Sequence, residues 1–154
     1  MRVLIAPDKF AGTLSAVQAA SAIAEGWHRR APGDEVDLAP MADGGPGFVD
    51  VLHATLGGEL LATTVTGPYG DPVPGTVLVH GPTAYVESAQ ACGLHLTAED
   101  ARAPERATSR GVGELVAAAV DVGLAARMSL HISGYLALRG MKPPMPYLPS
   151  GHYL

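Results

Sequence analysis

Hydrophobic and polar positions follow two different periods along the first third of the chain. An apolar run at residues 3–6 predicts a buried strand, and apolar positions three and four apart over residues 15–27 predict a helix. A second apolar run at 35–39 and a second helical pattern at 47–56 repeat this order. Strands that alternate with helices through short joins are typical of a parallel sheet. We therefore expect a Rossmann-like α/β segment over residues 1–58.

The apolar spacing within each helix predicts the side that faces the sheet. In the first helix these positions are Val17, Ala20, Ile23, Ala24 and Trp27. In the second they are Val49, Leu52 and His53. Thr13 or Ser15 can cap the first helix, because a hydroxyl at this position accepts a free backbone N–H.

The pattern changes after Gly58, where runs rich in Val and Thr alternate with turns rich in Gly and Pro. These runs lie at residues 59–66, 75–80 and 83–88. Short strands joined by turns predict an antiparallel meander, so we expect a mixed or antiparallel lobe over residues 59–106, with a short helix at 98–103.

A helical pattern returns at residues 111–122, after the capping candidates Thr108 and Ser109. Its predicted apolar face holds Leu115, Ala118 and Val122.

Beyond this helix the composition changes, since all fifteen acidic residues lie at or before Asp121. We expect residues 124–154 to form an atypical Pro-rich tail, because prolines within residues 141–149 are incompatible with a helix or a central strand. Such a tail is either accidental or a ligand for a proline-recognition groove.

Composition narrows the class of protein. A chain of 154 residues that is 47% apolar and 16% charged fits one folded, soluble domain rather than a disordered one. The net charge of −5 opposes a nucleic-acid surface, which needs clustered lysine and arginine. Neither a targeting segment nor a membrane span is expected, and the single cysteine, Cys92, suits a reducing compartment. We therefore expect a cytoplasmic protein with no membrane or nucleic-acid partner.

Two unusual loops follow the first two predicted strands. The first reads Ala-Pro-Asp-Lys-Phe-Ala-Gly-Thr at residues 6–13, and the second reads Pro-Met-Ala-Asp-Gly-Gly at residues 40–45. Ligands of parallel sheets bind beyond the carboxyl ends of the strands, where both loops would lie. Asp8 and Asp43 can each hold a metal ion or accept a hydroxyl proton, and the glycines let backbone N–H groups approach a ligand. The alternative for the second loop is a plain Asp-Gly turn.

Other common sites are excluded by the sequence. The chain has no G-x-x-x-x-G-K-[ST] loop, which excludes the ordinary P-loop mechanism. Its six histidines are scattered singly and form no metal motif, so we predict no metal site of protein ligands alone.

Five segments, in order, resemble the bacterial-type glycerate kinases, which phosphorylate glycerate with ATP. They lie at residues 6–16, 40–45, 65–70, 86–94 and 107–115, the last reading Ala-Thr-Ser-Arg-Gly-Val-Gly-Glu-Leu. Five ordered matches are far more specific than any one of them. The resemblance covers residues 1–123 and corresponds to the N-terminal third of a family member.

The resemblance implies a two-lobed α/β fold with the active site in the cleft between a Rossmann-like lobe and a smaller mixed lobe. Residues 107–123 would return to that cleft. The implied reaction is the ATP-dependent phosphorylation of glycerate to phosphoglycerate, with Mg²⁺ and a cation on the phosphates and an acid near the attacking hydroxyl.

The implied site residues fall into three groups. The catalytic candidates are Asp8 and Asp43, and the sequence leaves open which of them is the base and which holds the metal. The substrate-binding candidates are Lys9, Gly44, Gly45, Glu87 and Ser88. The nucleotide or phosphate loop would contain Thr108, Gly111 and Gly113. Simpler roles remain open: Thr108 as a helix cap, Glu87 as a solvated strand end and Lys9 as surface charge.

The chain also departs from the family pattern. Ala11 replaces a lysine and Pro46 replaces an acid, and the family's glycine-rich Gly-Gly-Ser-x-Thr-Asn-Asp-Gly-Gly segment does not follow residue 122. We hypothesise a truncation or a frameshift near Val122, with out-of-frame translation from about Leu124. The alternative function is therefore an inactive remnant that binds a ligand or a partner, with self-association through exposed sheet edges.

Overall fold

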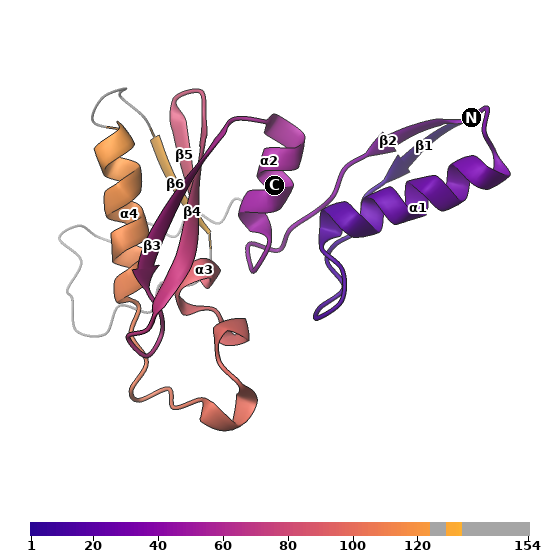
Figure 1. Ribbon diagram of the computed structural model, residues 1–154. Coiled ribbons are helices and arrows are strands. Elements are labelled where there is room, and N and C mark those ends of the chain that lie inside the picture. The colour runs from indigo at the N-terminus through magenta and orange to yellow at the C-terminus, as the bar shows by residue number, and fades with distance from the viewer. Residues whose placement is uncertain (124–128, 134–154) are drawn as a thin grey trace, which may run out of the picture.

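The computed structural model describes residues 1–123 and 129–133 (Figure 1). Its strands are β1 (Arg2–Ile5), β2 (Glu35–Leu38), β3 (Glu59–Thr66), β4 (Pro72–His80), β5 (Thr83–Glu87) and β6 (Ser129–Ser133). Its α-helices are α1 (Ala16–Arg30), α2 (Phe48–Leu56), α3 (Ala89–Cys92) and α4 (Arg110–Gly123). Two short 3₁₀ turns, Leu94–Leu96 and Glu99–Ala101, follow α3, and the second replaces the predicted helix at 98–103.

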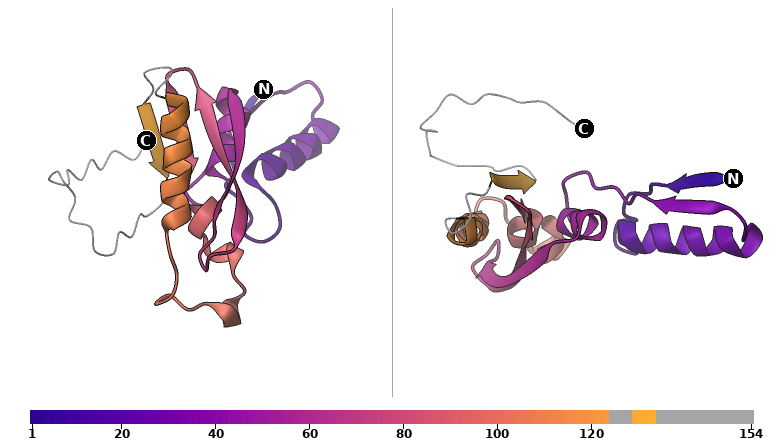
Figure 2. Two further views of the ribbon diagram at one scale, coloured as in Figure 1. Left: turned by 60° about the vertical axis from the view of Figure 1, so that its left-hand side comes forward. Right: turned by 90° about the horizontal axis from the view of Figure 1, so that it is seen from above.

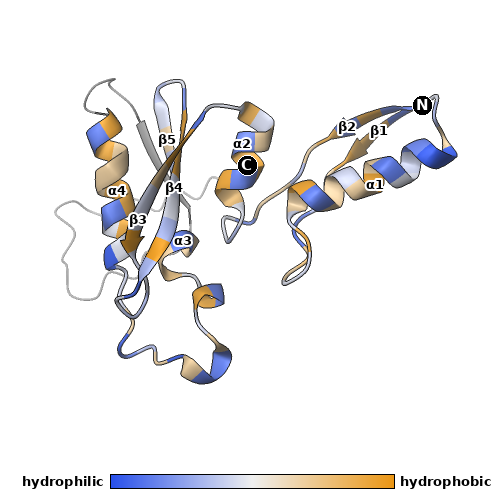
Figure 3. Ribbon diagram, in the orientation of Figure 1, coloured by the Kyte–Doolittle hydropathy of each residue, from blue (hydrophilic) through white to orange (hydrophobic). Residues whose placement is uncertain are grey.

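The N-terminal part is a parallel pair of strands covered on one face by a helix. Strand β1 pairs with β2 from Arg2 opposite Glu35 to Ile5 opposite Leu38. Helix α1 packs on one face of this pair, where Ile5, Ala20 and Ala24 form a small core. Figure 3 shows hydrophobic residues in both strands, and Leu4 is 67% exposed on the face that α1 leaves open. The predicted parallel arrangement is confirmed.

The buried face of α1 shares Ala20 and Ala24 with the predicted one and differs from it elsewhere. Its buried residues are Ala16, Ala19, Ala20 and Ala24. Ile23 and Trp27 lie on the flank instead, 44% and 36% exposed. Alanine has no bulk beyond Cβ, so Ala20 and Ala24 let the helix approach the two-stranded sheet closely. The indole N–H of Trp27 donates a hydrogen bond to Asp34 Oδ2 at 3.1 Å, so this half-exposed side chain has a polar partner.

The remaining strands form a four-stranded sheet in the order β3-β4-β5-β6. The first three are antiparallel, which confirms the predicted meander, and β6 is parallel to β5. Strand β4 begins earlier than predicted, at Pro72. Its first residues, with Pro74 among them, pair with β3 and lie beyond the end of β5. Thr76, two residues after Pro74, donates its N–H to Gln90 Oε1 and not to a strand. The N–H group that proline lacks at position 74 would point to this same side of β4, where β5 does not extend, so the proline is tolerated.

Helices α4 and α2 lie on opposite sides of this sheet (Figures 1 and 2). Helix α4 buries Val112, Leu115 and Ala119 rather than the predicted set with Val122. In α2 the buried residues are Val49 and Val51, whereas Leu52 and His53, predicted for the same side as Val49, are half-buried. Both helices carry apolar residues on more than one face. Packing against the sheet therefore decides which of these faces is buried.

Strand β6 lies within the stretch predicted to be an atypical tail. The rest of that stretch, including the Pro-rich run at 141–149, falls outside the described residues. Within the described part of the chain, every helix is too short or too polar to cross a membrane.

Candidate functional site

The candidate site lies where β1 and β2 end. The loop after β1 leads into α1, and the loop after β2 leads into α2. Two backbone hydrogen bonds join these loops, from Ala39 N to Ile5 O at 2.8 Å and from Met41 N to Pro7 O at 2.9 Å. Both loops therefore meet at the carboxyl edge of the parallel pair, where ligands of such sheets bind.

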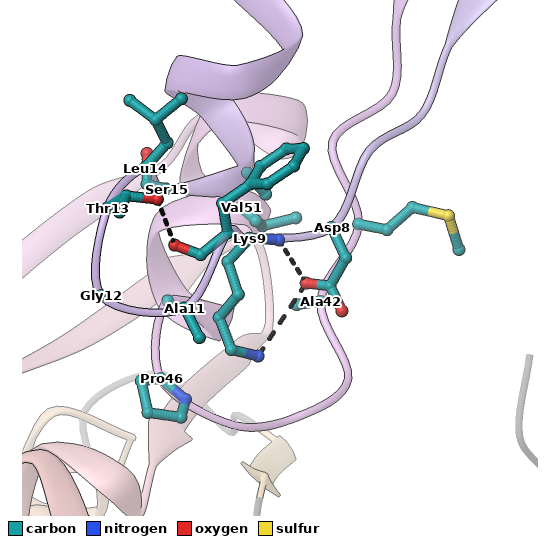
Figure 4. Close-up of a pocket in the computed structure, with 14 residues that line it drawn as sticks. Asp8, Lys9, Ala11, Gly12, Thr13, Leu14, Ser15, Ala42, Pro46 and Val51 are labelled. Carbon is teal, nitrogen blue, oxygen red and sulfur yellow. Dashed lines mark hydrogen bonds and ion pairs between the residues drawn. The ribbon is translucent and has the colours of Figure 1, made fainter.

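A cavity of about 300 Å³ opens between the two loops (Figure 4). Its walls are residues 8–16 of the first loop, Met41 and Ala42 of the second, and Pro46, Gly47 and Val51 at the start of α2. The volume suits a small polar metabolite rather than a large cofactor.

Lys9 is the centre of the polar contacts in this cavity. Its Nζ lies 2.7 Å from Asp43 Oδ1 and 3.9 Å from Asp8 Oδ1. Figure 4 shows its side chain extending between Ala11 and Asp8 toward Pro46. The lysine side chain is 24% exposed, whereas the two aspartates are half-exposed. One ammonium group is thus held between two carboxylates that remain accessible.

Asp43 is held in place by its neighbours as well as by Lys9. Its Oδ1 also accepts the backbone N–H of Gly45 at 2.9 Å. A Cβ on Gly45 would lie 2.9 Å from that same oxygen, so glycine is needed for this close approach. Gly44 has a φ of 85°, a left-handed conformation that favours glycine. The Asp-Gly-Gly sequence therefore folds the loop so that its acid faces Lys9.

Lys9 and Asp43 each stabilise the charged form of the other. The Lys9 ammonium, and next the Gly45 N–H, hold the pKa of Asp43 below its usual value. The hydrogen bond to Asp43 raises the pKa of Lys9, although desolvation opposes this. Both groups are therefore charged at neutral pH, and Asp43 is a weak proton acceptor.

A pH dependence of stability follows from the lowered pKa of Asp43. A carboxyl group whose pKa is depressed by folding contributes stability above its unfolded pKa, and this contribution is lost as the pH falls through the folded value. We expect the free energy of unfolding, measured with urea, to decline below about pH 4. Asp43→Asn should weaken this decline by less than about 1 kcal/mol, because the pair is partly exposed. The control, Asp121→Asn on the outside of α4, should leave it unchanged; an equal effect of both variants would contradict the assignment.

Two other predicted substrate residues are buried in the protein. Glu87 is 3% exposed, and its carboxylate accepts the backbone N–H groups of Gly47 and Val49, each at 3.1 Å. Ser88 is 5% exposed, and its carbonyl accepts the thiol of Cys92 at 3.3 Å. Neither residue lines the cavity.

The predicted nucleotide loop lies elsewhere, at the N-terminus of α4. Thr108 donates its N–H to Pro68 O at 2.9 Å, and its hydroxyl accepts the N–H of Arg110 at 3.1 Å, which is a local capping contact. A Cβ on Gly111 would collide with the carbonyl oxygen of Thr66, whereas Gly113 faces open space. None of the three predicted loop residues lines the cavity.

Sequence reasoning missed part of the cavity wall. Val51 of α2 lines it, and its apolar side chain carries no motif that distinguishes it from a core residue. Met41 also lines it and belongs to the second loop, which the sequence marked as a whole. The two positions that depart from the family pattern, Ala11 and Pro46, also line it. The departures therefore change the chemistry of this cavity directly.

The described residues contain no cluster of three or more His, Cys, Asp or Glu side chains that could hold a metal ion. Asp8 and Asp43 nevertheless suit Mg²⁺ of the kind found in phosphoryl transfer, which takes one or two carboxylates and keeps water and phosphate oxygens as its other ligands. The donor set fits such an ion.

Comparison with known proteins connects these residues to one family. A family model described as the glycerate kinase family matches residues 3–133. The match extends past Val122, and the hypothesised change of reading frame near that residue stays a proposal that the gene sequence tests.

Individual relatives agree with the family model. A glycerate kinase from Bacillus subtilis is 43% identical over 136 residues, which cover 87% of this chain and 35% of that protein. An uncharacterised protein from Mycobacterium tuberculosis is 49% identical over 150 residues, covering 92% of this chain and 38% of that protein. The crystal structure of a protein assigned as glycerate kinase 2 from Salmonella typhimurium LT2 has a TM-score of 0.69 and 34% identity, and covers 86% and 36% of the two chains. The chain thus spans little more than a third of the length of these relatives.

Proposed function

Because the chain belongs to the glycerate kinase family, we propose that its cavity forms the substrate side of a cleft in which ATP phosphorylates glycerate to phosphoglycerate. The observation that carries this proposal is the Lys9–Asp43 pair, set beside Asp8 over a cavity at the carboxyl edge of the parallel strands. A fixed cation beside accessible carboxylates is what phosphoryl transfer requires of a protein, because its catalysis consists mainly of positioning and charge stabilisation.

Each of the three side chains has a role in this proposal. Lys9 is the one cationic side chain among the described residues that line the cavity, so it receives the carboxylate of glycerate or an oxygen of the phosphate. Asp43 holds Lys9, since its lowered pKa makes it a poor base. Asp8 is then the carboxylate that accepts the proton of the attacking hydroxyl. When Mg²⁺ is bound, Asp8 or Asp43 would hold it, and the ion would offset phosphate charge.

Gly44 and Gly45 serve the same site by shaping the loop that carries Asp43. We include Ser88 in the wall behind the cavity, and assign Thr108, Gly111 and Gly113 to the nucleotide side of the complete cleft. The substrates are small molecules, and the use of ATP places the reaction in the cytoplasm.

A second candidate function rests on the short length of the chain relative to its relatives. In this alternative the chain is an inactive remnant that binds a ligand or a partner. Leu4 and Leu38, 67% and 47% exposed on the parallel pair, would then favour association with another chain.

Phosphorus NMR of the purified chain with ATP, Mg²⁺ and D-glycerate distinguishes the two functions. A new phosphoglycerate signal supports the kinase and identifies the hydroxyl that is modified. A soluble, folded sample that yields no such signal supports the remnant.

Replacing Ala11 by lysine is expected to strengthen the binding of glycerate. Ala11 is exposed on the cavity wall, so an ammonium group there adds a charge-assisted contact to a carboxylate. We expect the dissociation constant, measured by NMR titration, to fall about fivefold to tenfold, which corresponds to about 1 kcal/mol for a partly solvated contact. Ala11→Gln adds length without charge and serves as the control; equal affinities of the two variants would argue against an anion site.

A further inference from the structure

Glu87 is a buried carboxylate that the proposed chemistry does not use. It ends β5 and is 3% exposed, although acidic residues are almost never this buried without partners. Its partners are two backbone amides of another element: Oε1 accepts the N–H of Gly47 and Oε2 accepts the N–H of Val49, each at 3.1 Å. Both oxygens are therefore engaged by the start of α2, where Gly47 is part of the cavity wall.

The two amides belong to the first turn of α2, which has no cap of its own. Gly47 is the N-cap residue, with a φ of 96° and no side chain to accept a hydrogen bond. The first N–H groups of a helix have no partner within the helix, and its N-terminus favours negative charge. Glu87 supplies both the acceptor and the charge from forty positions later in the sequence.

The same contacts fix one end of the loop that carries Asp43. At the other end, Met41 N donates to Pro7 O at 2.9 Å. Between these points the described contacts of Asp43 are its ion pair with Lys9 and its hydrogen bond from Gly45. The position of the Asp43 carboxylate thus depends on where Glu87 holds Gly47.

We propose that Glu87 is a positioning residue, which sets the Asp43 loop against Lys9 by capping α2 and does not bind substrate. The consequence for activity rests on the proposed kinase function, whereas the consequence for the loop does not. A corollary concerns the helix N-termini: Glu87 takes up the N–H groups of Gly47 and Val49 in α2, and the capping box of Ser15 and Gln18 takes up one first-turn N–H of α1. Among the described residues that line the cavity, Lys9 is the one cationic side chain that can meet an anion.

Amide hydrogen exchange followed by NMR tests the proposal without reference to activity. In E87Q the uncharged amide keeps one acceptor oxygen, and we expect the amides of Gly47 and Val49 to exchange about tenfold faster or more. The matched control is E114Q, because Glu114 also accepts a backbone N–H, that of Thr66 at 2.7 Å, but outside the cavity. E114Q should accelerate exchange at Thr66 and leave Gly47 and Val49 unchanged.

The titration of the Asp43 carboxyl, observed by ¹³C NMR, separates positioning from simple stabilisation. Removing the charge of Glu87 would by itself lower the pKa of Asp43, since a like charge nearby disfavours ionisation. Loosening of the loop would instead raise it, through loss of the Lys9 and Gly45 contacts. We expect a rise in E87Q and no change in E114Q.

Unchanged protection of Gly47 and Val49 in a folded E87Q, or an unchanged or lowered pKa of Asp43, overturns the proposal. So does a loss of glycerate binding with loop exchange and the Asp43 titration unaltered, which would make Glu87 a substrate ligand. If E87Q does not fold, E87D is used: its carboxylate is one methylene shorter, and it should lose protection at one or both amides while keeping the charge. Full protection in E87D would overturn the proposal equally.

Discussion

Replacing Lys9 by methionine is expected to lower kcat/KM for glycerate phosphorylation by about 10²–10³-fold, the loss typical when one charge-stabilising donor is removed from an active site. Methionine keeps most of the length and the apolar stem of lysine but has no charge to meet an anion. Lys9 is the cation that the described part of the cavity presents, so no neighbouring side chain there replaces it. Coupled detection of ADP release, with glycerate varied, measures the effect.

The K9M result needs a control for surface charge and a readout that does not depend on turnover. Arg29→Met removes an exposed cation of α1 whose recorded partner is Glu25, at 2.6 Å, and should leave both activity and binding unchanged. In a chain that does not turn over, an NMR titration with glycerate gives the second readout: binding should be lost in K9M and kept in R29M. Glycerate binding that survives in K9M would remove Lys9 from the site.

Replacing Gly111 by alanine is expected to destabilise the protein by about 3 kcal/mol or more, at the upper end of the usual cost of overpacking. The new Cβ would meet the carbonyl oxygen of Thr66 and lie 3.0 Å from the Cβ of Ala91. Helix α4 has little freedom to move away, because Glu114 anchors it to β3 by accepting the N–H of Thr66 at 2.7 Å and its hydroxyl at 3.0 Å. Urea unfolding measures the change.

Gly113, two residues further along the same helix, is the matched control. A Cβ there meets nothing within 4 Å, so Gly113→Ala should stabilise the protein by about 0.5–1 kcal/mol through the higher helix propensity of alanine. Opposite signs for the two substitutions are the expected result. Equal and small effects would show that the N-terminus of α4 does not press against β3.

Most of the longer strands and helices could be located because their signals are local, whereas α3 and β6 were not predicted. Strand β3 begins at Glu59 and ends at Thr66 as predicted, since the glycines before it and the turn after it are visible in the sequence. The buried helix faces could not be predicted as well. Ile23 looks like a core residue by spacing, yet it is 44% exposed, and Ala20 and Ala24 are the residues of α1 that pack on the two-stranded sheet.

In the candidate site, too, some features could be predicted from the sequence and others could not. Asp8, Lys9 and Asp43 could be expected near one another because parallel strands end at the same edge. The role of Glu87 was out of reach, because a buried carboxylate that caps α2 from another strand leaves no local trace in either segment. Gly111 and Gly113 look equivalent in the sequence, although only the first meets β3.

By itself, then, the sequence determined the order of the longer elements up to α4, the family and the two loops that carry the acids, since these depend on short-range periodicity and on motifs. The tertiary structure decided which helix faces are buried, which predicted residues line the cavity and what Glu87 holds. These outcomes depend on contacts between segments far apart in the chain, whose energies are set by close packing and paired buried polar groups rather than by neighbouring residues.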